Sequence, residues 1–178
     1  MGPVVALSGF MGSGKTTVGR LVATALGFDF FDLDDEVAAL AGISVAAIFA
    51  AEGEAGFRAR EFTALDELLR CHRHAAGRKG LVVSLGGGAV AVPAIADELR
   101  RQAFVVFLET EVGEAWRRAG GTDRPLARSY AAFADLYQRR RAEYLESADE
   151  VVDTSGLSVN EVVEKVLQRI NDVLERSV

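Results

Sequence analysis

Short apolar segments alternate with amphipathic segments along the whole chain, and this alternation restricts the fold more than any other feature of the sequence. Five runs have the length and apolar character of strands: residues 3–8, 28–32, 81–85, 103–108 and 150–152. Apolar residues at helical spacing fill the intervals, at residues 18–26, 37–75 (with breaks near Gly42 and Gly53), 94–101, 111–119, 131–146 and from 158 onward. Strands separated by helices favour a parallel sheet covered on both faces. We therefore predict a single α/β domain over residues 1–178, with a central five-stranded parallel sheet and helices on both faces.

The composition excludes several other classes of protein. The chain has 178 residues, about one domain, and 49% hydrophobic with 26% charged residues are enough to form a core. Its net charge of −6 argues against a general nucleic-acid binder or a binder of anionic membranes. The lone Cys71 excludes an internal disulfide and a cysteine-based metal cluster. The longest uncharged stretch is broken by glycines and a proline, so we expect a cytoplasmic protein without a membrane segment.

The segment from Gly9 to Thr16 reads Gly-Phe-Met-Gly-Ser-Gly-Lys-Thr and matches the pattern G-x-x-x-x-G-K-[ST]. It follows a predicted buried strand and precedes a predicted amphipathic helix, as a P-loop requires. Backbone N–H groups in such a loop form a nest for anions, and the helix N-terminus adds to it. Lys15 is expected to reach the β- and γ-phosphates of a nucleoside triphosphate, and the Thr16 hydroxyl to ligate Mg²⁺. A glycine-rich turn without a ligand is the alternative, which the strand and helix context disfavours.

Two carboxylates follow at the end of the second predicted strand. Alternation along a strand would place Asp32 and Asp34 on the same side, and ligands of such sheets bind outside the carboxyl ends of the strands. Asp32 suits a water-mediated contact with Mg²⁺. Asp34 suits the orientation or deprotonation of a substrate hydroxyl. In the alternative interpretation, Asp34 only opens the next helix.

Two further motifs indicate a second substrate. Arg58 and Glu61 lie three residues apart on a predicted helix and can pair, either within a site or simply at the surface. Three consecutive glycines at residues 86–88 come directly after the third strand. They would leave a wall without side chains against which a ligand can lie, although a structural turn is the simpler interpretation.

The last motifs supply arginines. Gly120 and Gly121 offer a hinge for a lid at about residues 120–135, which carries Arg124 toward the transferred phosphate. Of the three arginines at residues 139–141, the middle one shares a helix face with Tyr144, so we expect Arg140 to face the cleft. Together these features predict phosphoryl transfer to a small, hydroxylated and negatively charged metabolite.

At these residues the sequence resembles the shikimate kinase family. The resemblance rests on the following motifs: G-x-x-x-x-G-K-T-T-x-G-R at residues 9–20, D-x-D at 32–34, I-F-x-x-x-G-E-x-x-F-R-x-x-E at 48–61, S-L-G-G-G-A at 84–89, R-P-L at 124–126 and R-x-x-x-Y at 140–144. It implies a P-loop kinase with a mobile lid that phosphorylates the 3-hydroxyl of shikimate from ATP, on the route to aromatic amino acids. It also implies Mg²⁺ as cofactor and, in our expectation, a monomer that binds neither nucleic acid nor membrane.

The resemblance assigns roles to individual positions. It implies Lys15, Asp34 and Arg124 as catalytic residues, and Thr16 with Asp32 as the magnesium site. The ATP-binding residues it implies are Gly12, Ser13, Gly14, Lys15, Thr16, Thr17, Arg117 against the adenine, and Arg124. The residues expected around shikimate are Asp34, Arg58, Glu61, Gly86, Gly87, Gly88 and Arg140.

Two other functions remain open on the sequence. A related P-loop kinase for another polyol acid, such as gluconate, would share the phosphate loop, but the glycine wall and the F-R-x-x-E motif argue against it. An ATP-binding regulator without turnover would be expected to have lost Lys15, Asp34 or Arg124, and all three are present.

Overall fold

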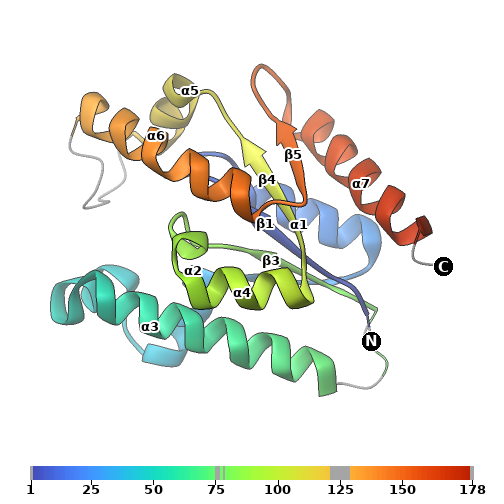
Figure 1. Cartoon of the computed structure of the whole chain (residues 1–178), viewed down its shortest axis with the longest axis horizontal. Coiled ribbons are helices and arrows are strands. Elements are labelled where there is room, and N and C mark those ends of the chain that lie inside the picture. The colour runs from blue at the N-terminus through green and yellow to red at the C-terminus, as the bar shows by residue number, and fades with distance from the viewer. Residues whose placement is uncertain (1, 75–76, 78, 121–128, 177–178) are drawn as a thin grey trace.

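Five strands form one parallel sheet, as predicted, and their order in the sheet is β2-β3-β1-β4-β5 (Figure 1). The computed structural model describes residues 2–74, 77, 79–120 and 129–176. The strands are β1 (Val4–Ser8), β2 (Asp29–Asp32), β3 (Leu81–Ser84), β4 (Phe104–Glu109) and β5 (Glu150–Asp153). The chain leaves β1 toward β2 and leaves β3 toward β4, so the winding reverses between the adjacent strands β1 and β3. In open parallel sheets a ligand crevice forms at the carboxyl ends of the strands at such a reversal.

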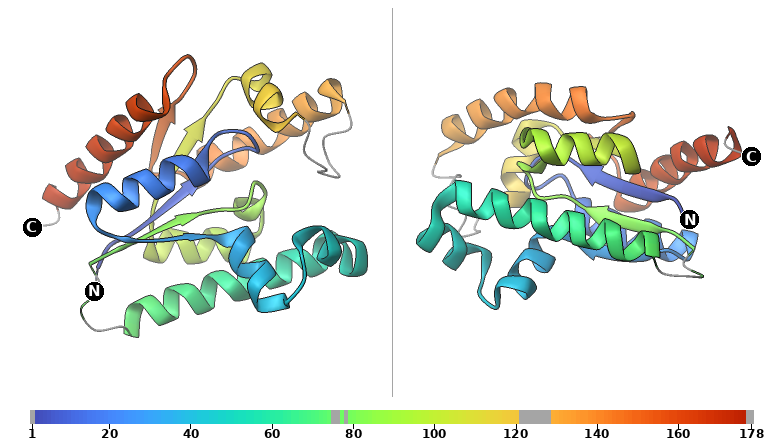
Figure 2. Two further views of the ribbon diagram at one scale, coloured as in Figure 1. Left: turned by 180° about the vertical axis from the view of Figure 1, so that it is seen from behind. Right: turned by 60° about the horizontal axis from the view of Figure 1, so that its bottom comes forward.

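Helices cover both faces of the sheet (Figure 2). They are α1 (Lys15–Leu26), α2 (Leu33–Ala41), α3 (Val45–His74), α4 (Pro93–Gln102), α5 (Val112–Ala119), α6 (Tyr130–Ser147) and α7 (Val159–Arg176), with a short 3₁₀ helix η1 (Ala89–Ala91). Helices α1 and α7 lie together on one face, and α3, α4 and α6 lie on the other.

The alternation of side chains along β1 builds a separate hydrophobic core on each face. Val4 and Ala6 pack into the core beneath α3, α4 and α6, whereas Val5 and Leu7 pack into the core beneath α1 and α7. All five residues of β1 are buried, which explains why this central strand is apolar at every position. The P-loop that follows it is therefore attached to a fully buried strand.

The structure differs from the sequence prediction around the second strand. Strand β2 ends at Asp32, and helix α2 begins at Leu33, so Asp34 lies in the first turn of a helix. The prediction that strand alternation places Asp32 and Asp34 on one side was therefore wrong. The breaks predicted near Gly42 and Gly53 are confirmed, because Gly42 ends α2 with φ 68° and Gly53 interrupts α3 with φ 69° and ψ −172°.

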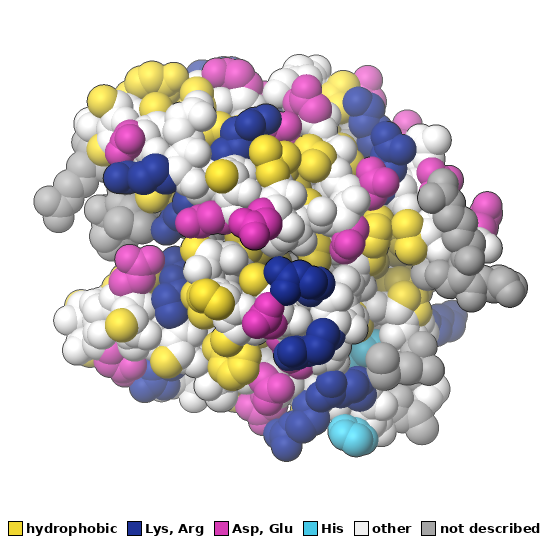
Figure 3. Space-filling model, viewed as in Figure 1, with side chains coloured by type: hydrophobic (Ala, Val, Ile, Leu, Met, Phe, Trp, Pro, Cys, Tyr) yellow, Lys and Arg dark blue, Asp and Glu magenta, His cyan; other side chains and the backbone are white. Residues whose placement is uncertain are grey.

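Residues 121–128, which are half of the predicted lid and include Arg124, lie outside the described part of the chain. Within the described residues no single helix has the length and apolar character needed to cross a membrane, although α2 and α3 together, bent by 94°, pass that test by length and composition. On the face shown in Figure 3, acidic and basic side chains are interspersed with small groups of hydrophobic ones.

Candidate active site

Glycines determine the backbone conformation of the loop between β1 and α1. Gly12 and Gly14 have φ of 82° and 88°, a left-handed conformation that residues with a side chain rarely adopt. A Cβ on Gly12 would overlap the carbonyl oxygen of Ala115 in α5. The loop is thus packed directly against α5, while a Cβ on Gly14 would meet no atom within 4 Å. The open side of the loop lies at Gly14, at the N-terminus of α1.

Lys15 is held against the loop that precedes it. Its Nζ donates hydrogen bonds to the carbonyl oxygens of Gly9 at 2.8 Å and Phe10 at 3.0 Å. Burial and these two bonds fix the ammonium group at the mouth of the anion nest. This placement suits a side chain that contacts the phosphates held by the loop.

A cavity of ≈ 380 Å³ lies where β1, β2 and β3 end. Its lining includes five of the predicted site residues from the P-loop and both predicted carboxylates. The lining residues are Met11, Gly12, Gly14, Lys15, Thr16, Thr17, Asp32, Asp34, Asp35, Ser84, Leu85 and Gly87. The predicted phosphate-binding residues and the predicted hydroxyl-binding residue therefore share one cavity.

Thr16 and Asp32, the predicted magnesium residues, are in direct contact. The Thr16 hydroxyl donates a hydrogen bond to Asp32 Oδ2 at 2.6 Å. The hydroxyl oxygen of Ser84 lies 3.5 Å from the Thr16 hydroxyl oxygen. No group of three or more His, Cys, Asp or Glu residues suited to a metal occurs in the described part of the chain. A hydroxyl backed by one carboxylate fits Mg²⁺, which takes most of its oxygen ligands from water and phosphate. Sequence reasoning missed Ser84, whose signal was a hydroxyl at the end of a strand that neighbours the P-loop strand.

Asp32 and Asp34 reach the cavity by a different route from the one predicted. Asp32 caps α2, because its Oδ1 accepts a hydrogen bond from the N–H of Asp34 at 3.1 Å. Helix α2 then carries Asp34 into the cavity from its first turn. In the alternative interpretation of the sequence, Asp34 was the carboxylate that opens the helix. In the structure, Asp32 caps the helix instead.

The pair of Arg58 and Glu61 is an interior feature. Their side chains are joined at 2.6 Å, and Glu61 is 0% exposed while Arg58 is 16% exposed, so the surface interpretation was wrong. Burial raises the pKa of Glu61, against the effect of Arg58 and with a further increase from Asp34. Burial opposes the charge of Arg58, but the carboxylates of Glu61 and Glu54 outweigh it and raise the Arg58 pKa. The arginine therefore stays charged in a largely dehydrated position.

The three arginines of α6 separate as the helix geometry predicted. Arg140 is 11% exposed and donates to the carbonyl oxygen of Gly87 at 3.0 Å. The hydroxyl of Tyr144 donates to the same carbonyl oxygen. Arg139 instead pairs with Asp135, and Arg141 with Glu109. The inward orientation of Arg140 is confirmed, and its contact with a substrate remains a prediction.

The glycine wall at residues 86–88 adjoins these groups at its two ends. A Cβ on Gly86 would overlap Glu61 Oε1 and lie 2.8 Å from Asp34 Oδ1. A Cβ on Gly88 would overlap Arg58 Nη2 and lie 3.1 Å from Arg140 Nη2. The wall therefore brings Asp34 and Glu61 to one end and the two arginines to the other.

Some predicted residues are not brought into this arrangement. Arg117 is exposed on α5, the helix that packs against Gly12, and Arg124 lies outside the described residues. Sequence reasoning also assigned no role to Glu54, whose Oε1 lies 3.2 Å from Arg58 Nη2. Its signal was an acidic residue directly after the helix-breaking Gly53.

The family model and the sequence relatives point to one family. The shikimate kinase family model matches residues 11–171. The shikimate kinase of Halorhodospira halophila is 42% identical over 168 residues, covering 92% of this chain and 91% of that protein. That of Bordetella avium is 39% identical over 168 residues, covering 92% and 77%.

Solved structures agree with the sequence comparison. The shikimate kinase from Acinetobacter baumannii in complex with shikimate superposes with a TM-score of 0.87 at 35% identity, covering 97% of this chain and 94% of that one. The enzyme from Aquifex aeolicus gives 0.80 at 32% identity, covering 94% and 96%. A gluconokinase from Sinorhizobium meliloti, at 0.60 and 20% identity, shares only the fold. With a family model that spans most of its length and relatives well above 30% identity, this chain belongs to the shikimate kinase family.

Proposed function

We propose that this protein transfers the γ-phosphate of ATP to the 3-hydroxyl of shikimate, with Mg²⁺ as cofactor. The observation that carries the proposal is the position of Asp34. It lines the cavity that also contains Lys15, and it lies at the end of the glycine wall whose other end carries two arginines. A ring acid with hydroxyl groups fits between them, its carboxylate at the arginines and a hydroxyl at Asp34.

Each residue has a distinct task in the proposed reaction. Arg58 and Arg140 bind the carboxylate and orient the ring, and Asp34 accepts a hydrogen bond or proton from the attacking hydroxyl. Lys15 contacts the transferred phosphate as a positive charge. Thr16, with Asp32 behind it, would hold Mg²⁺, which neutralises phosphate charge when bound.

The nucleotide is placed by the loop and by α5. We propose that residues 12–17 bind the ATP phosphates and that Arg117 lies against the adenine, since α5 packs on the loop at Gly12. Arg124 is proposed to contact ATP from the lid. Because every one of these residues comes from one chain, a monomer is sufficient for the proposed reaction.

Identification of the product tests this proposal. Incubation with ATP, Mg²⁺ and shikimate should give one phosphate monoester, detected by ³¹P NMR and located on the 3-hydroxyl by proton–phosphorus coupling. Gluconate under the same conditions should give none. Phosphorylation of gluconate in place of shikimate would assign the chain to the other polyol-acid kinase.

A further inference from the structure

Glu54 lies between the two arginines proposed to bind the substrate's carboxylate. Its Oε1 is 3.2 Å from Arg58 Nη2 and 3.9 Å from Arg140 Nη2. Among the described residues, it is the carboxylate that forms an ion pair with both arginines. One carboxylate of the protein itself thus bridges the guanidinium groups of Arg58 and Arg140.

The remaining contacts of the arginines fix the direction in which their Nη2 atoms point. Arg58 Nη1 is engaged by Glu61, and Arg140 Nη1 by the carbonyl oxygen of Gly87. Both Nη2 atoms converge on the place where Gly88 leaves room for them. The same convergent pair of donors suits the carboxylate of a substrate.

The Glu54 side chain is also able to move away from the two arginines. Its side chain is 55% exposed, in contrast to the buried Glu61. It directly follows Gly53, the non-helical residue that interrupts α3. Rotation of the Glu54 side chain toward solvent would therefore release both arginines without disturbing a packed core.

We propose that Glu54 is a substrate-mimicking counter-ion that any anion must displace to bind Arg58 and Arg140. This inference rests on the proposed function, because it identifies the two arginines as the carboxylate site. A small anion that binds the arginines alone must compete with Glu54 and gains little. Shikimate also contacts Asp34 and the glycine wall, and these additional contacts let it displace Glu54.

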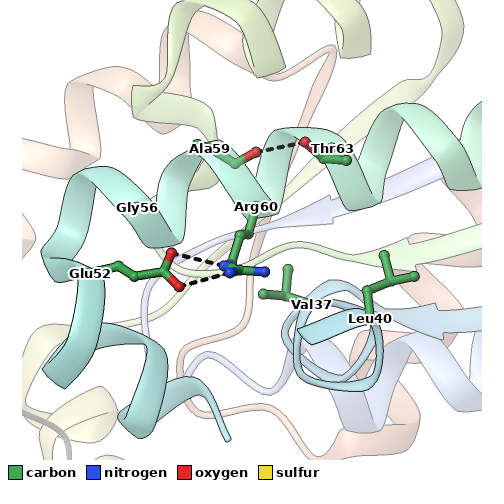
Figure 4. Close-up of a pocket in the computed structure, with 7 residues that line it drawn as sticks. All are labelled: Val37, Leu40, Glu52, Gly56, Ala59, Arg60 and Thr63. Atoms are coloured by element: carbon green, nitrogen blue, oxygen red, sulfur yellow. Dashed lines mark hydrogen bonds and ion pairs between the residues drawn. The ribbon is translucent and has the colours of Figure 1, made fainter. Parts of the chain in front are cut away.

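The test compares Glu54→Gln with the matched control Glu52→Gln. Glu52 lies on the same interruption of α3, but its carboxylate pairs with Arg60 at 2.7 and 2.9 Å, beside the separate hollow between α2 and α3 (Figure 4). Both variants lose one negative charge; Glu52→Gln loses the ion pair with Arg60, and Glu54→Gln loses the ion pairs with Arg58 and Arg140. Only Glu54→Gln frees the proposed carboxylate site.

Two quantities are measured: the Kd of shikimate by calorimetry, and the Ki of acetate against shikimate at saturating ATP. Exposed ion pairs are weak, so we expect Glu54→Gln to lower both constants by roughly two- to tenfold. Glu52→Gln should leave both unchanged. Glu54→Ala should act in the same direction as Glu54→Gln, which guards against an effect of the new amide.

A higher or unchanged shikimate Kd in folded Glu54→Gln would overturn the inference, since Glu54 would then support the arginines or have no part in binding. Circular dichroism establishes that the variant is folded. Failure of the wild-type protein to bind shikimate at all would instead refute the proposed function, so the two failures are distinguishable.

Discussion

At the scale of single residues, the substrate side of the cavity is built from charges that water hardly reaches. Glu61 Oε2 accepts a hydrogen bond from Arg58, whereas the buried Glu61 Oε1 has no hydrogen-bond partner in the described part of the chain. A buried carboxylate with an unsatisfied oxygen costs free energy unless it is protonated or serves a ligand site. Glu61 therefore gives this site a pH-dependent stability.

The first prediction concerns that pH dependence. Because burial raises the Glu61 pKa above its ordinary 4.5, folded Glu61 keeps its proton to higher pH than the unfolded chain does. The resulting stabilisation is complete below the unfolded pKa and is lost as pH rises through the folded pKa. The free energy of unfolding of wild type, minus that of Glu61→Gln, should fall as pH rises from below 4.5 to neutrality. Urea unfolding at several pH values measures it, and a difference that grows with pH would contradict the burial argument.

The second prediction separates the arginines of α6. A bidentate arginine–carboxylate contact is worth about 1.5–3 kcal/mol, so Arg140→Lys should raise the shikimate KM roughly ten- to a hundredfold. The KM for ATP should change much less. Arg139→Lys and Arg141→Lys, whose parent residues pair with acids outside the cavity, serve as controls and should be near neutral. A large effect of either control with none for Arg140→Lys would refute the assignment.

The third prediction concerns Tyr144, a positioning residue that shares the Gly87 carbonyl with Arg140. Tyr144→Phe keeps the ring stacked on Phe107 but removes the hydroxyl. Losing one such hydrogen bond costs about 1 kcal/mol, so the shikimate KM should rise roughly fivefold while the ATP KM stays constant. Tyr130→Phe, at the exposed start of the same helix, is the matched control. Equal changes in both KM values would indicate a general structural effect instead.

At the scale of elements, the glycine wall after β3 gathers residues that are distant in sequence. It adjoins α2 through Asp34, α3 through Arg58 and Glu61, and α6 through Arg140. The three glycines serve different purposes, because side chains of neighbouring elements occupy the space at Gly86 and Gly88 but not at Gly87. At Gly87 an added Cβ would meet its nearest atom at 3.6 Å, an ordinary contact.

The fourth prediction uses this difference. Gly88→Ala should displace both arginines and raise the shikimate KM by roughly tenfold or more, since overpacking typically costs 1–3 kcal/mol. Gly87→Ala should leave the stability of the free protein nearly unchanged. Any loss of shikimate affinity in Gly87→Ala then reports a direct clash with the ligand. Thermal unfolding and steady-state kinetics on both variants provide the test, and a Gly88→Ala variant with wild-type shikimate KM would contradict the described geometry.

Sequence reasoning was most accurate where local chemistry determines the element. The P-loop requires a strand, glycines and a helix in a fixed order, so its context at Lys15 was evident. The end of β2 was misassigned, because a carboxylate that caps a helix and one at the end of a strand look the same in sequence; Asp32 is the cap, and Asp34 follows it. The burial of Glu61 and the bridging role of Glu54 depend on contacts between separate elements, which spacing alone does not reveal.

At the scale of the whole molecule, the order of the strands explains why one cavity contains both the residues proposed to bind phosphate and the residue proposed to bind the acceptor hydroxyl. The winding reverses between β1 and β3, so the P-loop and the glycine wall leave neighbouring strands at the same edge of the sheet. Leu7 of β1 pairs with Ser84 of β3, and each lies two residues before the first glycine of its loop, Gly9 and Gly86. The residues proposed to bind the phosphate donor and the acceptor hydroxyl are thereby brought to one cavity.

The most direct test of this account is the rate of ADP release at saturating ATP and Mg²⁺, with and without shikimate, for wild type and Lys15→Met. We predict release that depends on shikimate in wild type and is abolished in Lys15→Met, with the variant still folded by circular dichroism. An ADP release rate that does not depend on shikimate would contradict this account. So would a Lys15→Met variant that keeps more than about a tenth of the wild-type kcat, which corresponds to a loss of less than about 1.4 kcal/mol.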